Sequence, residues 1–109
     1  MFKEKHHIVF KKQGGLDMEV NYIYLNSEDH RGNNGPHKSR ERDLELKCEM
    51  ERELREILDG EYFTEEKLMY LLGIDANTAY KAFRKVYKTR QGMSKEDVIF
   101  RLMGGKFYL

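Results

Sequence analysis

A regular repeat of apolar positions in the middle of the chain predicts one long helix over residues 39–58. Apolar residues recur there at spacings of four, four and three positions, namely Leu46, Met50, Leu54 and Ile57. These spacings place the side chains on one face of a helix, which therefore has an apolar stripe to bury. The segment contains neither Gly nor Pro, and Asp59-Gly60 supplies a stop signal directly after it.

Two short segments before this helix predict strands. Residues 5–12 and 20–25 are rich in β-branched and aromatic side chains, and Gly14-Gly15 lies between them. We expect the two strands to pair as an antiparallel ribbon. Residues 26–36 are dense in Asn, Ser, Asp and Gly, a composition typical of a loop or a single helical turn.

Three shorter helices and a terminal strand are expected after the long helix. Each helix begins at a residue whose side chain can accept a hydrogen bond from the first helical turn, namely Thr64, Asp75 and Ser94. The expected ranges are 64–73, 76–86 and 94–103 for the helices and 106–109 for the strand. The fold class is therefore α+β, and we expect two units, residues 1–59 and 60–109.

Length and composition exclude several classes of protein. A chain of 109 residues forms one small domain or two very small ones. It contains no apolar run of about 18 residues, so we expect no contact with a membrane. The single cysteine, Cys48, excludes an intramolecular disulfide and a zinc site built from cysteine pairs. No apolar signal segment is visible after Met1, so the cytoplasm is the expected compartment.

The net charge of +1 says little about partners, but the basic residues are unevenly placed. Residues 76–95 contain six basic side chains and no acidic one: Lys81, Arg84, Lys85, Lys88, Arg90 and Lys95. This window covers the second helix of a helix-turn-helix spacing and the turn after it, and the C-terminal unit resembles a small excisionase-type winged helix. Lys81, Arg84 and Lys85 are therefore candidate contacts to DNA phosphates. The alternative is a helical cap with a solubilising surface.

Histidine is even more unevenly distributed than the basic residues. All four histidines, His6, His7, His30 and His37, lie in the first 37 residues. Imidazole is the commonest metal ligand and titrates near neutral pH. Neighbours on a strand point to opposite faces, so His6 and His7 are expected to have different tasks. A twisted strand end would let one bind a metal while the other faces a substrate.

These residues belong to a set of short motifs that resembles the HNH endonuclease family. The motifs are, in order, His6-His7-Ile8, Gly14-Gly15, Asn21-Tyr22-Ile23-Tyr24-Leu25, Glu28-Asp29-His30 and Gly35-Pro36-His37. The motifs are most similar to those of small HNH-like proteins of phages and prophages, and the resemblance covers residues 5 to about 48. It implies a ββα-metal unit followed by the long helix.

The resemblance also implies a role for each polar residue of the motifs. His7 matches the general base that activates a water molecule, and His6 and His30 match ligands of one divalent metal ion. Asn21 matches the asparagine that holds the loop of the base in place. His37 resembles a further ligand or a phosphate contact, although a straight helix could not run from His30 to it. Histidine ligation suits Zn²⁺, Ni²⁺, Co²⁺ or Mn²⁺ more than Mg²⁺, and Mg²⁺ bound through few protein ligands and water is the alternative.

The expected function is a metal-dependent DNA endonuclease or nickase. Arg31, Lys38 and Arg40 follow the histidines in sequence, and their cationic groups could grip phosphates near the scissile bond. The family's usual cysteine pairs are missing. Two alternatives use the same fold: a catalytically silent DNA-binding protein, and a phage-type module that binds a host or phage protein.

Overall fold

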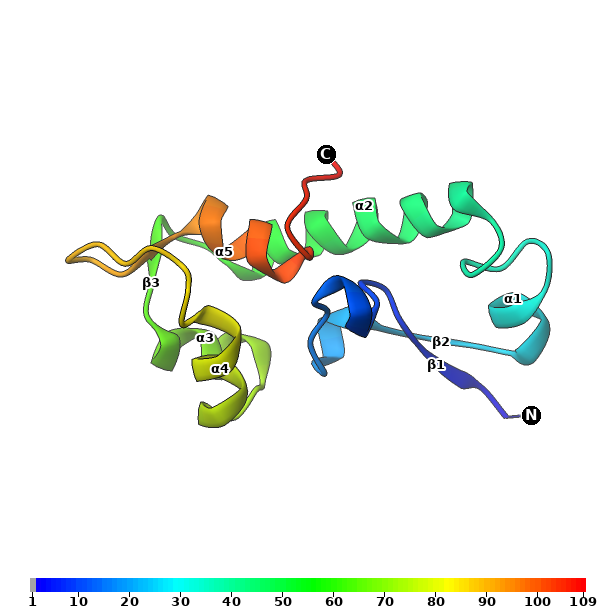
Figure 1. Ribbon diagram of the computed structural model, residues 1–109, viewed down its shortest axis with the longest axis horizontal. Coiled ribbons are helices and arrows are strands. Elements are labelled where there is room, and N and C mark those ends of the chain that lie inside the picture. The colour runs from blue at the N-terminus through cyan, green and yellow to red at the C-terminus, as the bar shows by residue number, and fades with distance from the viewer. Residues whose placement is uncertain (1) are drawn as a thin grey trace.

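The chain folds along one long helix, α2 (Arg40–Ile57), which runs down one side of the molecule (Figure 1). The computed structural model describes residues 2–109, and its principal axes measure 47, 26 and 23 Å. A hairpin and a short helix lie towards one end of α2, and three short helices lie towards the other. The expected helix 39–58 is confirmed to within one residue at each end, with the Ser39 side chain accepting the capping hydrogen bond.

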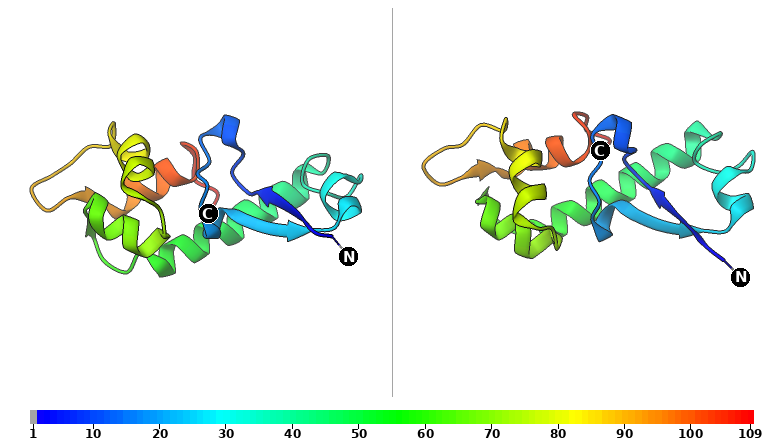
Figure 2. Two further views of the ribbon diagram at one scale, coloured as in Figure 1. Left: turned by 90° about the horizontal axis from the view of Figure 1, so that it is seen from below. Right: turned by 60° about the horizontal axis from the view of Figure 1, so that its bottom comes forward.

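The N-terminal part is an antiparallel hairpin followed by a short helix. Strands β1 (Glu4–His7) and β2 (Tyr22–Leu25) pair with His6 opposite Ile23 and His7 opposite Tyr22. Helix α1 (Ser27–Arg31) comes directly after β2 and packs against both strands (Figure 2). Of the two alternatives for residues 26–36, a loop or a single helical turn, the helical turn is present over residues 27–31, and it returns the chain over the hairpin.

The C-terminal part combines three helices with a second two-stranded sheet. Its elements are β3 (Tyr62–Phe63), α3 (Glu65–Leu72), α4 (Ala76–Phe83), β4 (Met93–Ser94) and α5 (Lys95–Leu102). Thr64, Asp75 and Ser94 each accept a hydrogen bond from the third residue of the helix that follows, which confirms the three expected caps. Together with the N-terminal part, the described residues form an α+β fold with five α-helices and two small antiparallel sheets.

Four expected elements differ from the observed ones. The strand expected over 20–25 begins at Tyr22, because the residues before it form a short 3₁₀ helix, η2 (Glu19–Asn21). The strand expected over 5–12 ends at His7, because the chain then bends into a short 3₁₀ helix, η1 (Lys11–Gln13). Helix α4 ends at Phe83 instead of residue 86. Residues 106–109 form no strand, since the Tyr108 N–H donates to the buried Glu51 carboxylate at 2.7 Å and not to a neighbouring strand.

The core is a single cluster of buried side chains that runs along α2. Leu46, Met50 and Leu54 on the apolar stripe are at most 1% exposed. The cluster also contains Val9 from the N-terminal part and Phe83 from the C-terminal part. Both expected units therefore contribute side chains to one core, and their division at residue 59 stays a prediction. No helix within residues 2–109 has the length and apolar character needed to cross a bilayer.

Candidate metal centre

The hairpin and α1 bring two of the predicted metal ligands together. Glu4 and His6 occupy alternate positions of β1, so both side chains face the same side of the sheet. The Asn26 side chain accepts a hydrogen bond from the Asp29 N–H at 2.7 Å, which starts α1 immediately after β2. His30 lies in the last turn of α1 and reaches the Glu4–His6 side of the hairpin.

A tight turn after α1 adds His37 to the same cluster. At Gly35, a Cβ atom would lie 2.5 Å from the Asp29 carbonyl oxygen and 2.7 Å from the His30 carbonyl oxygen, so the turn requires glycine. The chain doubles back at this point, and no helix connects His30 to His37. Sequence reasoning left the position of His37 open because it could not foresee this turn.

The three imidazoles converge on one point. His6 Nδ1 lies 3.1 Å from His30 Nε2, and His37 Nε2 lies 2.8 Å from the same atom. All three nitrogens lie within 4.8 Å of one another, so the three side chains could hold a metal ion. The predicted ligands His6 and His30 are thus placed together, with His37 beside them.

The hydrogen bond between Glu4 and one ring nitrogen of His30 leaves a lone pair on the other nitrogen, which can bind a cation. His30 Nδ1 lies 3.1 Å from Glu4 Oε1, and a carboxylate only accepts, so this nitrogen donates. In a neutral imidazole, Nε2 then carries the lone pair that faces His6 and His37. A carboxylate that orients the far nitrogen of a histidine is a common feature of metal-ligating imidazoles. Glu4 was missed from the sequence, although its position two residues before His6 was a usable signal.

Burial favours the neutral, metal-binding form of His6 and of His37. His6 is 1% exposed, and its burial, followed by the nearby charges of His37 and His30, lowers its pKa from 6.5 to about 4. Burial also lowers the pKa of His37, although part of that side chain reaches solvent. His6 Nε2 is buried and has no hydrogen-bond partner within residues 2–109. The donor set of neutral imidazoles fits a first-row transition ion such as Zn²⁺ better than Mg²⁺.

His7 lies beside the cluster but has a separate partner. Its Nε2 atom lies 2.7 Å from Asp17 Oδ1, and Asp17 also contacts Lys11 Nζ at 3.1 Å and the Tyr22 hydroxyl at 3.3 Å. Hydrogen bonds from His7 and then Lys11 lower the pKa of Asp17 to about 2. His7 and the three clustered histidines line one pocket, so their different partners do not separate them in space. The sequence did not single out Asp17, because loops commonly contain carboxylates.

Asn21 fastens the loop that follows His7. Its side-chain oxygen accepts a hydrogen bond from the Val9 N–H at 2.7 Å, and its amide nitrogen donates to the carbonyls of Val9 at 3.0 Å and Leu16 at 2.9 Å. The side chain is fully buried. This placement is compatible with the loop-holding role that the resemblance implies.

The predicted phosphate contacts fall into two groups. Arg31 lies near the histidines but pairs with Glu4 at 2.6 Å, while Lys38 and Arg40 are exposed and form no salt bridge within residues 2–109. The second group lies in the other half of the molecule and comprises Lys81, Arg84 and Lys85, all exposed on α4 or at its end. The fold therefore does not bring all six around one point.

Comparisons of the chain with family models, with curated proteins and with solved structures gave no match. Membership of the HNH family stays a prediction from the motifs. What the fold itself supplies is a cluster of three histidines with a fourth histidine in the same pocket.

Proposed function

We propose that the protein is a metal-dependent DNA endonuclease or nickase with a ββα-metal site. The observation that carries the proposal is the convergence of three imidazole nitrogens next to a fourth histidine that stays outside the cluster. Three protein ligands leave coordination positions for water and substrate, as in catalytic zinc sites. A separate histidine in the same pocket supplies the base that such a site needs.

His6, His30 and His37 would hold one divalent ion. When bound, the ion supplies positive charge that stabilises the phosphate and the leaving oxygen of a phosphodiester. Glu4 keeps the His30 lone pair directed at the cluster by accepting the proton of the opposite nitrogen. Phe10 stacks against His37, with ring centroids 5.2 Å apart, and limits the positions that this exposed side chain can adopt.

His7 acts as the general base. Because Asp17 accepts a hydrogen bond from His7 Nε2, the free lone pair of the neutral ring is on Nδ1. His7 takes a proton from water, the water oxygen bonds to phosphorus, and the bond from phosphorus to the leaving sugar oxygen breaks. Asp17 stabilises the imidazolium that results. The base contributes about 10²–10⁴-fold to the rate.

A supercoiled-plasmid assay with added divalent metal tests this function. We expect nicked or linear product with Zn²⁺, Ni²⁺, Co²⁺ or Mn²⁺, no product with excess chelator, and no product from His7→Ala. Because His7 handles a proton and not the metal, His7→Ala keeps its metal affinity. Cleavage by His7→Ala at the wild-type rate would rule out the base, and the absence of cleavage with every metal would rule out the function.

The same preparations separate the two alternative functions. A catalytically silent DNA-binding protein would retain plasmid without cutting it, with an affinity that falls as salt rises. A module that binds another protein would do neither. Both results differ from metal-dependent cleavage, so one set of samples distinguishes the three functions.

A further inference from the structure

Three neighbouring hollows join the histidine pocket to the C-terminal helices. Lys11 lines both the histidine pocket and a second hollow that α4 borders. Arg101 lines both the second hollow and a third one between α5, the residues that follow α4, and Gln13. Each adjacent pair of hollows thus shares a lining residue, and we call the surface that the three form together the basic groove. The cationic residues that line its second and third hollows are Lys11, Lys81, Lys85 and Arg101.

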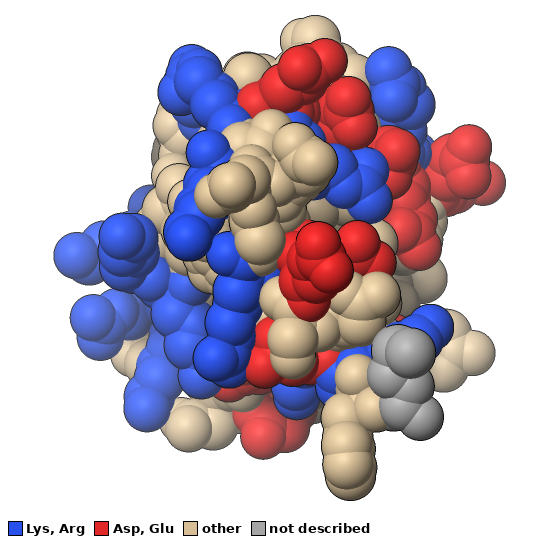
Figure 3. Space-filling view, turned by 90° about the vertical axis from the view of Figure 1, so that its right-hand side faces the viewer, with Lys and Arg blue, Asp and Glu red and all other residues tan. Residues whose placement is uncertain are grey.

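The groove carries uncommitted positive charge. Lys81 and Lys85 lie one helical turn apart, are exposed, and form no salt bridge within residues 2–109. Of its two carboxylates, Asp17 is already paired with His7 and Lys11. Seen from the end that carries α1, Lys and Arg gather along one side of the molecule and most Asp and Glu lie away from it (Figure 3). This charge distribution suits a polyanion.

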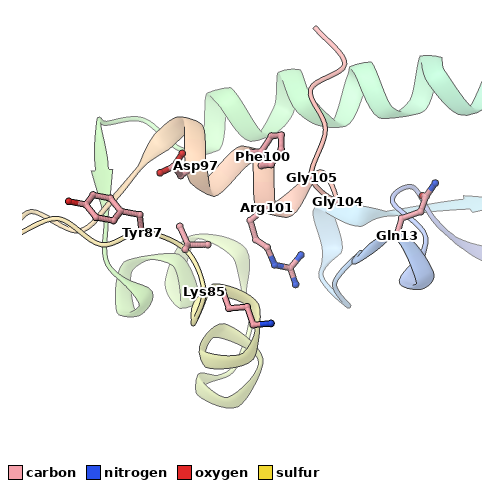
Figure 4. A pocket seen from close by; sticks show the side chains of 9 residues that line it. Gln13, Lys85, Tyr87, Asp97, Phe100, Arg101, Gly104 and Gly105 are labelled. Carbon is pink, nitrogen blue, oxygen red and sulfur yellow. The ribbon is translucent and has the colours of Figure 1, made fainter.

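Arg101 holds the walls of the groove in a fixed arrangement. Its Nη1 atom donates to the Gly14 carbonyl at 2.9 Å, and its Nε atom donates to the Ala82 carbonyl at 2.7 Å. The side chain reaches from α5 into the space between Lys85 and Gln13 (Figure 4). One guanidinium thus connects the loop after η1 to the end of α4, so the groove exists before any ligand binds.

Aromatic rings lie among these cations. Phe10 lines the histidine pocket, and Tyr87 and Phe100, which are 73% and 43% exposed, line the third hollow. Basic grooves with aromatic rings bind single-stranded nucleic acid, because phosphates meet the cations while unpaired bases stack on the rings. A paired duplex keeps its bases out of reach of such rings.

We infer that the basic groove binds single-stranded DNA and leads it to the histidine pocket. The inference rests on the proposed function, and it narrows the substrate to DNA with an unpaired segment beside the scissile bond. The groove fixes which strand enters the histidine pocket, while the chemistry stays with the histidines.

Fluorescence anisotropy with metal-free protein in chelator tests this inference without cleavage. The probes are a labelled single-stranded DNA oligonucleotide, the same sequence as a blunt duplex, and the same sequence as RNA. We expect the single strand to bind more tightly than the duplex. Substituting Lys81→Gln and Lys85→Gln together should flatten the slope of log affinity against log salt by about 1.4, at about 0.7 per lost contact, and weaken binding by roughly 50-fold at 50 mM salt.

A second pair of variants controls for the loss of two positive charges. Arg52 and Lys67 are exposed on α2 and α3 and line none of the three hollows, so Arg52→Gln with Lys67→Gln should bind single-stranded DNA like the wild type. Circular dichroism of both double variants verifies that each is folded.

The inference fails if the duplex binds as tightly as the single strand, if the RNA binds more tightly than the DNA, or if the control pair loses as much affinity as the groove pair. Failure of the proposed function is a different result, namely no metal-dependent cleavage, and it leaves these affinities unchanged.

Discussion

Glu4 and His30 are 26 positions apart in sequence, yet a carboxylate oxygen of Glu4 lies 3.1 Å from His30 Nδ1. The contact fixes which nitrogen of His30 faces His6 and His37. The Glu4 carboxylate also pairs with Arg31 at 2.6 Å, so its own orientation is restrained from the far side. The orientation of His30 in the cluster therefore depends on a carboxylate that lies outside the three imidazoles.

Removing this carboxylate should weaken metal binding without removing a ligand. We expect Glu4→Ala to reduce the affinity for Zn²⁺ by about 10–100-fold, measured by isothermal titration calorimetry, because the His30 ring loses its orientation and some basicity. Glu28→Ala, on the exposed surface of α1, is the matched control and should bind like the wild type. An unchanged affinity in Glu4→Ala would show that the carboxylate has no part in the metal site.

The three clustered histidines should together bind a single metal ion. We expect one ion per chain, and His6→Ala, His30→Ala and His37→Ala should each lose more affinity than the roughly 10–100-fold expected for an outer partner. His37 is exposed, so its substitution should leave the unfolding temperature of the metal-free protein unchanged. If His37→Ala binds metal normally, only two histidines hold the ion; if all three variants do, there is no site.

The pairing of His7 with Asp17 predicts a measurable titration. NMR of the Asp17 carboxyl should give a pKa of about 2 in the wild type and a value closer to 3.8 in His7→Ala, because His7 is the main cause of the shift. Asp75 is a control in the same spectra, since its pKa is lowered by the Thr78 backbone at a helix cap. An Asp17 pKa that stays near 2 in His7→Ala would mean that Lys11 and Tyr22, and not His7, lower it.

The lowered pKa of Asp17 also determines how its small contribution to stability changes with pH. Since the folded pKa of Asp17 is depressed, its contribution is fully present above pH 3.8 and disappears as the pH falls through about 2. The side chain is 57% exposed, so solvent screening limits the contribution to under about 1 kcal/mol. Acid unfolding of Asp17→Asn should therefore lack a component in this pH window that the wild type shows.

Asn21 should matter for stability as much as for activity. Asn21→Ala removes two buried hydrogen bonds and a part-buried one and leaves the Val9 N–H without its acceptor, so we expect a loss of about 3 kcal/mol in the free energy of unfolding. Urea denaturation measures it, and Asn33→Ala, at an exposed position of the turn after α1, should change it by less than about 0.5 kcal/mol. Equal losses of unfolding free energy in the two variants would contradict the role of Asn21 in holding the loop that follows His7.

Local signals in the sequence were sufficient for the helices. The stripe through Leu46 and Leu54 and the cap residues act within one or two helical turns, so spacing alone locates them. His6 and His30 were proposed as partners from the resemblance of their motifs to the HNH family, and the hairpin with α1 brings them together. In each of these cases the controlling interactions lie close together along the chain.

The position of His37 and the burial of two charged residues of α2 depend on contacts that the spacing of residues along the chain does not reveal. His37 reaches the cluster only because Gly35 permits a close approach of backbone to backbone. Lys47 and Glu51 carry charges on the long helix, yet they are at most 1% exposed. Lys47 pairs with Asp43, and Glu51 accepts hydrogen bonds from Arg55 and the Tyr108 backbone. The partner of Glu51 at the end of the chain is 57 residues away, which also explains why the expected terminal strand does not form.

Insertion of a single residue into α2 would turn everything after it by about 100° relative to everything before it. The histidines lie on the side of the chain before α2, and most of the basic groove lies after it. The N-terminal and C-terminal parts both pack on the apolar stripe of α2, so a rotation of one part relative to the other would break this packing. Over evolutionary time, the length of α2 should therefore vary far less than that of the exposed tip at residues 90–91, which lies outside the Thr89–Gly92 bridge.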